Sequence, residues 1–115
     1  MNVRGKPLTI CSTKPITGYN RTGYCSYDPK DPGTHLVCAT VTDDFLRFTK
    51  SKGNDLITPR NSFPGLKAGD KWCLCTYRWL QAYKAAMAPD VDLDATHVQA
   101  LQVIPKKALF EKTHL

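Results

Sequence analysis

Glycine and proline are concentrated in the first 34 residues, and this constrains the fold more than any other feature of the chain. Glycine admits left-handed backbone and proline removes an amide donor, so both interrupt helices and strands. The interruptions are Gly5, Pro7, Pro15, Gly18, Gly23, Pro29, Pro32 and Gly33. We therefore predict an irregular, loop-rich N-terminal segment that depends on the rest of the chain for its packing.

The middle of the chain carries clearer patterns. Residues 34–41, THLVCATV, run apolar and β-branched without alternation, which predicts a core strand buried on both faces. Thr42 or Asp43 can cap a helix that extends to Lys52 and stops at Gly53. Residues 54–71 then return to loop, with two prolines and two glycines.

The C-terminal half mixes short strands and helices. Residues 72–75 predict a strand, and Thr76 can cap a helix that reaches Met87 before Pro89. We expect a short strand at 91–93, a helical turn at 95–100, a strand at 101–104 and a last helix at 106–112. With no βαβ period and no repeat, the prediction is α+β: one globular domain over 1–115, with a small mixed sheet and two to three helices.

Charge and hydropathy limit the partners. No run of about 18 apolar residues exists and the N-terminus lacks a signal-peptide core, so we expect a soluble, cytoplasmic protein without a membrane partner. The net charge of +6 is spread over both halves, and Lys106-Lys107 is the sole adjacent basic pair. No nucleic-acid-binding signature accompanies it, which argues against a nucleic-acid partner.

The cysteine count is odd, at five. They are Cys11, Cys25, Cys38, Cys73 and Cys75. An odd count in a reducing compartment argues against a disulfide framework, so we predict free cysteines that pack as small hydrophobes. Of these, Cys73 and Cys75 would fill small gaps beside Trp72 and Trp79.

Two chemical alternatives remain for these thiols. His35 and Cys38 have a common ligand spacing and, if their strand neighbours residues 72–75, would combine with Cys73 and Cys75 in a zinc site. No other cofactor is predicted. In a thiol enzyme the candidates are Cys73 or Cys75 as nucleophile, His97 or His35 as base, and Asp70 or Asp94 as the group that orients it.

Several strings in the chain carry a family resemblance. The longest are GNDL at 53–56, FPGLKAGD at 63–70 and WCLC at 72–75 with a following Arg78-Trp79. The others are Cys11-Ser12-Thr13, Pro15, Thr17-Gly18-Tyr19, His35, Val37-Cys38-Ala39, Thr42-Asp43, Phe45-Leu46, Thr58-Pro59 and Ala95-Thr96-His97. Over nearly its whole length the chain resembles domain of unknown function 2237, a family of small, mostly bacterial proteins. Members often read Cys-Cys where this chain has Tyr24-Cys25. The resemblance implies a shared fold and no activity.

The loops hold the remaining candidates for binding. These are Asn54, Asp55, Arg60, Arg78 and Trp79. Turn formation after Gly53, and an ion pair of Arg78 with Asp70 or Asp55, would account for them structurally. We interpret the chain as a non-catalytic binding or accessory module that recognises a small molecule or a protein through residues 54–71 and the N-terminal coil. The alternative is a thiol- or metal-dependent enzyme that uses Cys73 or Cys75 with His97 or His35.

Overall fold

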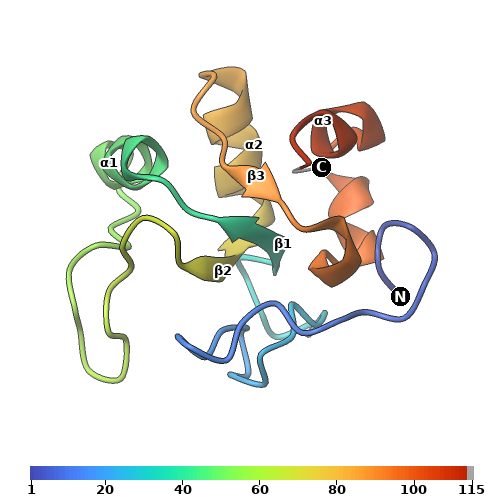
Figure 1. The fold of residues 1–115 in the computed structure, drawn as a ribbon, viewed down its shortest axis with the longest axis horizontal. Coiled ribbons are helices and arrows are strands. Elements are labelled where there is room, and N and C mark those ends of the chain that lie inside the picture. The colour runs from blue at the N-terminus through green and yellow to red at the C-terminus, as the bar shows by residue number, and fades with distance from the viewer. Residues whose placement is uncertain (114–115) are drawn as a thin grey trace.

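The computed structural model describes residues 1–113 and shows a three-stranded antiparallel sheet with helices packed on it (Figure 1). The elements in chain order are β1 (His35–Thr40), α1 (Asp43–Ser51), β2 (Lys71–Cys75), α2 (Thr76–Lys84), β3 (Asp90–Val91), the 3-10 helices η1 (Leu93–Ala95) and η2 (Val98–Gln102), and α3 (Lys106–Glu111). The strand order is β2-β1-β3. The predicted α+β class is confirmed.

Strand β1 is the centre of the sheet, as its unbroken apolar sequence predicted. It pairs antiparallel with β2, placing Cys38 opposite Cys73 and Ala39 opposite Trp72, and with β3, placing Ala39 opposite Val91. Residues on both faces of β1 are buried. One face meets the main apolar core, beneath the α-helices in Figure 1.

Helix α1 begins at its predicted cap, whereas Thr76, predicted to cap α2, is the first residue of that helix and its hydroxyl donates to the Thr34 carbonyl. The Thr42 hydroxyl accepts a hydrogen bond from the Phe45 amide at the start of α1, and Phe45 is fully buried. Helix α2 buries Trp79 and ends at Lys84, so Met87 lies beyond it, contrary to the prediction. Within residues 1–113, none of the helices has the length and apolarity of a membrane span.

The N-terminal coil covers the opposite face of the sheet (Figure 1). It contributes Cys11 and Cys25 to a second buried cluster with Cys38, Cys73 and Ala95. Disulfides join Cys11 to Cys38 and Cys25 to Cys73, and Cys75 remains free. The prediction that all five thiols are free is therefore wrong. Partners 27 and 48 positions apart meet only because the coil folds back over the sheet.

The segment 101–104 was predicted as a strand and is helical instead. Its first two residues end η2, and the Val103 and Ile104 amides both donate to the Ala100 carbonyl. Ile104 is fully buried, so the β-branched residues that indicated a strand fill the core from a helical turn. Here tertiary packing outweighed local propensity.

Candidate functional site

A cavity of about 430 Å³ opens between the N-terminal coil, the sheet and the loop after α1. We call it the Trp72 pocket. Its lining residues are Gly18, Tyr19, Arg21, His35, Asn54, Leu56, Arg60, Phe63, Trp72 and Cys73. Trp72 and Cys73 are buried, whereas Arg21 and Arg60 are exposed. The volume lies within the range of small-molecule sites.

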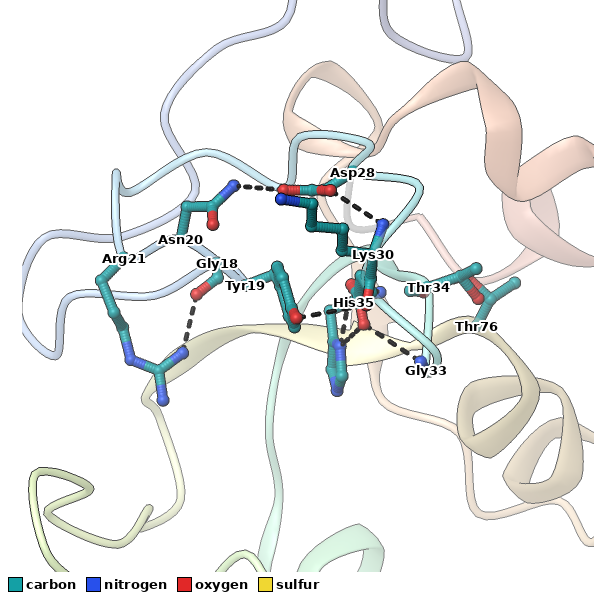
Figure 2. Close-up of polar contacts among 11 residues, drawn as sticks. Gly18, Tyr19, Asn20, Arg21, Asp28, Lys30, Gly33, Thr34, His35 and Thr76 are labelled. Carbon is teal, nitrogen blue, oxygen red and sulfur yellow. Dashed lines mark hydrogen bonds and ion pairs between the residues drawn. The ribbon is translucent and has the colours of Figure 1, made fainter.

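Tight backbone turns hold the coil wall of the pocket. Gly18 has a φ of +97°, and a Cβ there would overlap the carbonyl oxygen of Tyr24, so the wall requires glycine. The Arg21 side chain donates to the Gly18 carbonyl at 2.7 Å (Figure 2). The Cys73 amide donates to the buried hydroxyl of Thr17, which fastens this wall to β2.

A second set of hydrogen bonds links this wall to the turn before β1. The Tyr19 hydroxyl donates to the Lys30 carbonyl, and the Asn20 amide donates to Asp28 (Figure 2). The Asn20 amide and then the Lys30 backbone amide lower the pKa of Asp28. Tyr19 therefore stands fixed at the pocket mouth, stacked on the His35 ring with centroids 6.5 Å apart.

His35 is oriented by a buried carboxylate. Its Nδ1 lies 2.8 Å and 3.0 Å from the two carboxylate oxygens of Asp31, whose side chain is 1% exposed. Since a carboxylate only accepts, Nδ1 carries a proton and Nε2 stays available to a ligand. Asp31 also accepts from the backbone amides of Gly33 and His35, so it shapes the turn as well as the ring.

Two guanidinium groups flank the pocket, each over an aromatic ring. Arg21 lies 5.1 Å from the Trp72 ring centroid, and Arg60 lies 5.4 Å from that of Phe63. Arg60 donates to the Asp55 carbonyl and is 4.0 Å from the Asp55 carboxylate. Within residues 1–113, no carboxylate lies within ion-pair distance of Arg21. Cation–π contact fixes each group and leaves N–H donors free.

A larger cavity of about 620 Å³ lies near β3. Its charged side chains already neutralise one another. The pairs are Arg4 with Asp94, Lys71 with Asp92 and Lys112 with Asp90. The Trp72 pocket differs because Arg21 has no such partner among residues 1–113, so this pocket is the stronger candidate for a charged ligand.

Comparison with protein families decides the relationship of the chain. Residues 1–113 match the family described as an uncharacterized protein conserved in bacteria, DUF2237. The chain belongs to the DUF2237 family. A comparison with curated proteins found no match.

The strings that carry the DUF2237 resemblance converge on the Trp72 pocket. Every lining residue except Arg21 and Arg60 belongs to one of them, although they come from the coil, β1, the loop after α1 and β2. In the larger cavity, Thr42 alone does so. A further cavity of about 530 Å³ is also lined mainly by such strings, among them Pro15, Pro64 and Gly65, so these strings surround two cavities.

The predicted binding residues separate into two groups. Asn54 and Arg60 line the pocket, and the Asp55 carbonyl accepts a hydrogen bond from the Arg60 side chain. Hydrogen bonds from the Thr58 side chain and from the Thr58 and Ile57 amides hold the pKa of Asp55 at about 2.

The other two predicted binding residues lie elsewhere. Arg78 bonds the Lys52 carbonyl and Gln81, not the predicted Asp70 or Asp55. Trp79 is fully buried in the core and donates to the Pro89 carbonyl.

The structure separates most of the predicted thiol-enzyme residues and makes neighbours of one pair, Cys75 and His35. Cys73 is buried in a disulfide, and His97 accepts the Gln99 amide at its Nδ1 to cap η2. Asp70 accepts the Lys67 amide in a turn, and Asp94 pairs with Arg4. This DUF2237 chain retains Cys75, half-buried and opposite His35 in the sheet register.

The predicted zinc ligands are also divided. Cys38 and Cys73 are bonded to Cys11 and Cys25, while His35 bonds Asp31. With both disulfides formed, the set of His35, Cys38, Cys73 and Cys75 cannot assemble. The register does make the two strands neighbours, as that hypothesis required.

Sequence reasoning missed Tyr19, Arg21 and Phe63 as lining residues and Asp31 as the partner of His35. Thr17-Gly18-Tyr19 and FPGLK were visible as motifs, but nothing local indicated a shared cavity. The sequence around Arg21 shows only a cation in a loop that contains glycines, and many roles fit that pattern. Only the fold of the DUF2237 chain singles these residues out.

The partly buried His97 cap of η2 predicts a pH effect on stability. Burial lowers the pKa of His97 from its ordinary 6.5, with a smaller effect from the N-terminal amine. As pH falls below 6.5 the unfolded chain binds a proton that the folded chain resists, so the free energy of unfolding should fall until the folded pKa is reached. Urea denaturation at pH 7.5 and 5.5 measures this. His97→Asn, which retains a capping acceptor, should reduce the difference; an unchanged difference would assign it to other groups.

Proposed function

We propose that the chain is a binding module that holds a small anionic molecule in the Trp72 pocket. The observation that carries the proposal is the Arg21 guanidinium, fixed over Trp72 with no carboxylate partner in residues 1–113. A guanidinium fork suits a carboxylate or phosphate, because it donates two parallel hydrogen bonds.

The remaining walls indicate the rest of the ligand. Leu56 and Phe63 are partly buried apolar residues that line the cavity, and Phe63 packs edge-on against Trp72. Asn54 also lines it, with its amide nitrogen bonded to the Thr49 hydroxyl. The expected ligand therefore combines an anionic group, held by Arg21 and Arg60, with a flat apolar part on Leu56 and Phe63.

The test compares phenyl phosphate, benzoate and the neutral isostere benzamide by tryptophan fluorescence and calorimetry. We expect the aryl anions to bind and benzamide to bind at least tenfold more weakly. Arg21→Gln should weaken aryl-anion binding by about 10-fold to 100-fold, since charged hydrogen bonds contribute about 1.5–3 kcal/mol.

Arg47→Gln provides the matched control. Arg47 is an exposed arginine of α1, paired with Asp44 and outside the pocket, so its loss changes net charge equally. Affinity should remain within twofold of the original protein. Equal weakening by both variants, or no aryl-anion binding at millimolar concentration, would refute the proposal.

One observation favours a second function, acid–base catalysis on a ligand in the same pocket. The Asp31–His35 pair has the arrangement of a general base and its orienting carboxylate. Cys75 lies beside it in register, but no hydrogen bond joins the Cys75 and His35 side chains in the described chain. His35→Gln tests this second function. Both functions predict that the ligand still binds to the variant, but only the catalytic function predicts a loss of turnover.

A further inference from the structure

Four buried cysteines form one cluster between the coil and the sheet. The Sγ atoms of Cys11, Cys25 and Cys38 lie within 4.8 Å of one another, and Cys73 is bonded to Cys25. The one other member of this cluster is Ala95, which is fully buried. The site is therefore rich in sulfur and shielded from water, an environment that favours soft thiolate-binding metals.

The backbone positions these cysteines through bonds that do not involve sulfur. Cys38 and Cys73 face each other on paired strands, where their amides donate to the buried hydroxyls of Thr96 and Thr17. Cys11 and Cys25 stand at the two ends of one loop, and the Cys11 amide donates to the Gly23 carbonyl next to that second end. Breaking the disulfides leaves all of these hydrogen bonds available.

We propose that the reduced chain binds one zinc-like divalent cation through Cys11, Cys25, Cys38 and Cys73. A thiol or phosphine reductant supplies four electrons, and with four protons the two disulfides become four thiols. The cation then displaces thiol protons as the four sulfurs coordinate it. The disulfide and metal-bound forms are two states of the same cluster.

The distances suit this coordination. Zinc–sulfur bonds of about 2.3 Å in a tetrahedron place the sulfurs about 3.8 Å apart. The sulfurs of Cys11, Cys25 and Cys38 already lie within 4.8 Å of one another. The Cys73 sulfur lies outside that group and must move closer by side-chain rotation once its disulfide is reduced. Arg21 shares the pocket wall with Cys73 and adds positive charge near a tetrathiolate site that would carry net negative charge.

Cobalt titration of the reduced protein tests the site. The full chain is reduced with a phosphine without oxygen, and Co²⁺ is added while the absorption spectrum is recorded. We expect one equivalent per chain, with thiolate-to-cobalt charge-transfer bands and the visible bands of tetrahedral Co²⁺. Zinc should displace the cobalt, and four thiols should resist alkylation until a chelator is added.

Variants identify the ligands. Cys38→Ser and Cys73→Ser should weaken Co²⁺ binding at least 100-fold, and Cys75→Ser and His35→Gln should leave the spectrum unchanged. Cys75 is the matched control because it lies on the same strand outside the cluster. Dependence of the spectrum on Cys75 or His35 would overturn this assignment.

Folding supplies a second measurement. If the reduced, metal-free chain unfolds, zinc should restore the near-ultraviolet circular dichroism of its tryptophans. A reduced chain that stays folded but binds no Co²⁺, or one that zinc does not refold, would refute the site. None of these readouts requires the anion-binding function, so the two proposals stand or fall separately.

Discussion

Replacing Cys25 and Cys73 together by alanine is expected to lower the free energy of unfolding by about 4 kcal/mol. The disulfide closes a separation of 48 residues, and loss of so long a cross-link restores much conformational freedom to the unfolded chain. A domain of this size has roughly 5–15 kcal/mol of stability, so the loss is large. Urea denaturation of the oxidised proteins, with a chelator present, measures it.

The same variant should also lose ligand affinity, because the disulfide anchors the wall that carries Gly18, Tyr19 and Arg21. Cys75→Ala is the control: it removes a half-buried thiol without a cross-link and should cost less than about 1 kcal/mol. A thiol count of five in the unreduced, unfolded protein would contradict the disulfide assignment. Equal destabilisation by Cys75→Ala would contradict the cross-link explanation.

Trp79→Ala should destabilise the fold by about 3–5 kcal/mol through the cavity it leaves. The indole is fully buried, stacks on Tyr83 with centroids 5.4 Å apart, and donates from Nε1 to the Pro89 carbonyl. It therefore stabilises the contact of α2 with the chain that leads into β3. The change in urea midpoint, at an unchanged denaturant slope, reports the loss.

Trp79→Phe is the companion variant for this prediction. It retains most of the ring volume and removes the indole N–H, so a smaller loss, near the value of one buried hydrogen bond and a partial cavity, is expected. Binding of an aryl anion should persist in the Phe variant, since Trp79 does not line the Trp72 pocket. A loss of affinity without a loss of stability would return Trp79 to the candidate ligand-binding residues.

The elements that local pattern predicted share a simple physical origin. The segment His35–Thr40 is apolar on both faces because it is the central strand, and Thr42 caps α1 with its own side chain. These outcomes depend on residues only a few positions apart, so the local sequence determines them. The strand predicted at 101–104 failed because Val103 and Ile104 pack on the core from the turn that follows η2.

The candidate site depends much less on local pattern. Asn54 and Arg60 were recognisable as loop residues without a core role, and they do line the pocket. Asp31 lies only four residues before His35, and the turn between them sets its carboxylate against the ring. Arg21 acquired its role only when the coil folded across the sheet, which set its guanidinium over Trp72. Contacts between residues far apart in the chain are set by the path of the coil, and no local pattern encodes that path.

The sequence alone determined the class of the fold, its core strand, the first helix and the irregular character of residues 1–34, because each follows from periodicity or from the chemistry of glycine and proline. Tertiary structure decided the state of the cysteines. Cys38 and Cys73 meet through strand register, and Cys11 and Cys25 reach them through the returning coil. The same folding placed Arg21 in a cavity with no carboxylate partner among the described residues, which is the basis of the proposed function.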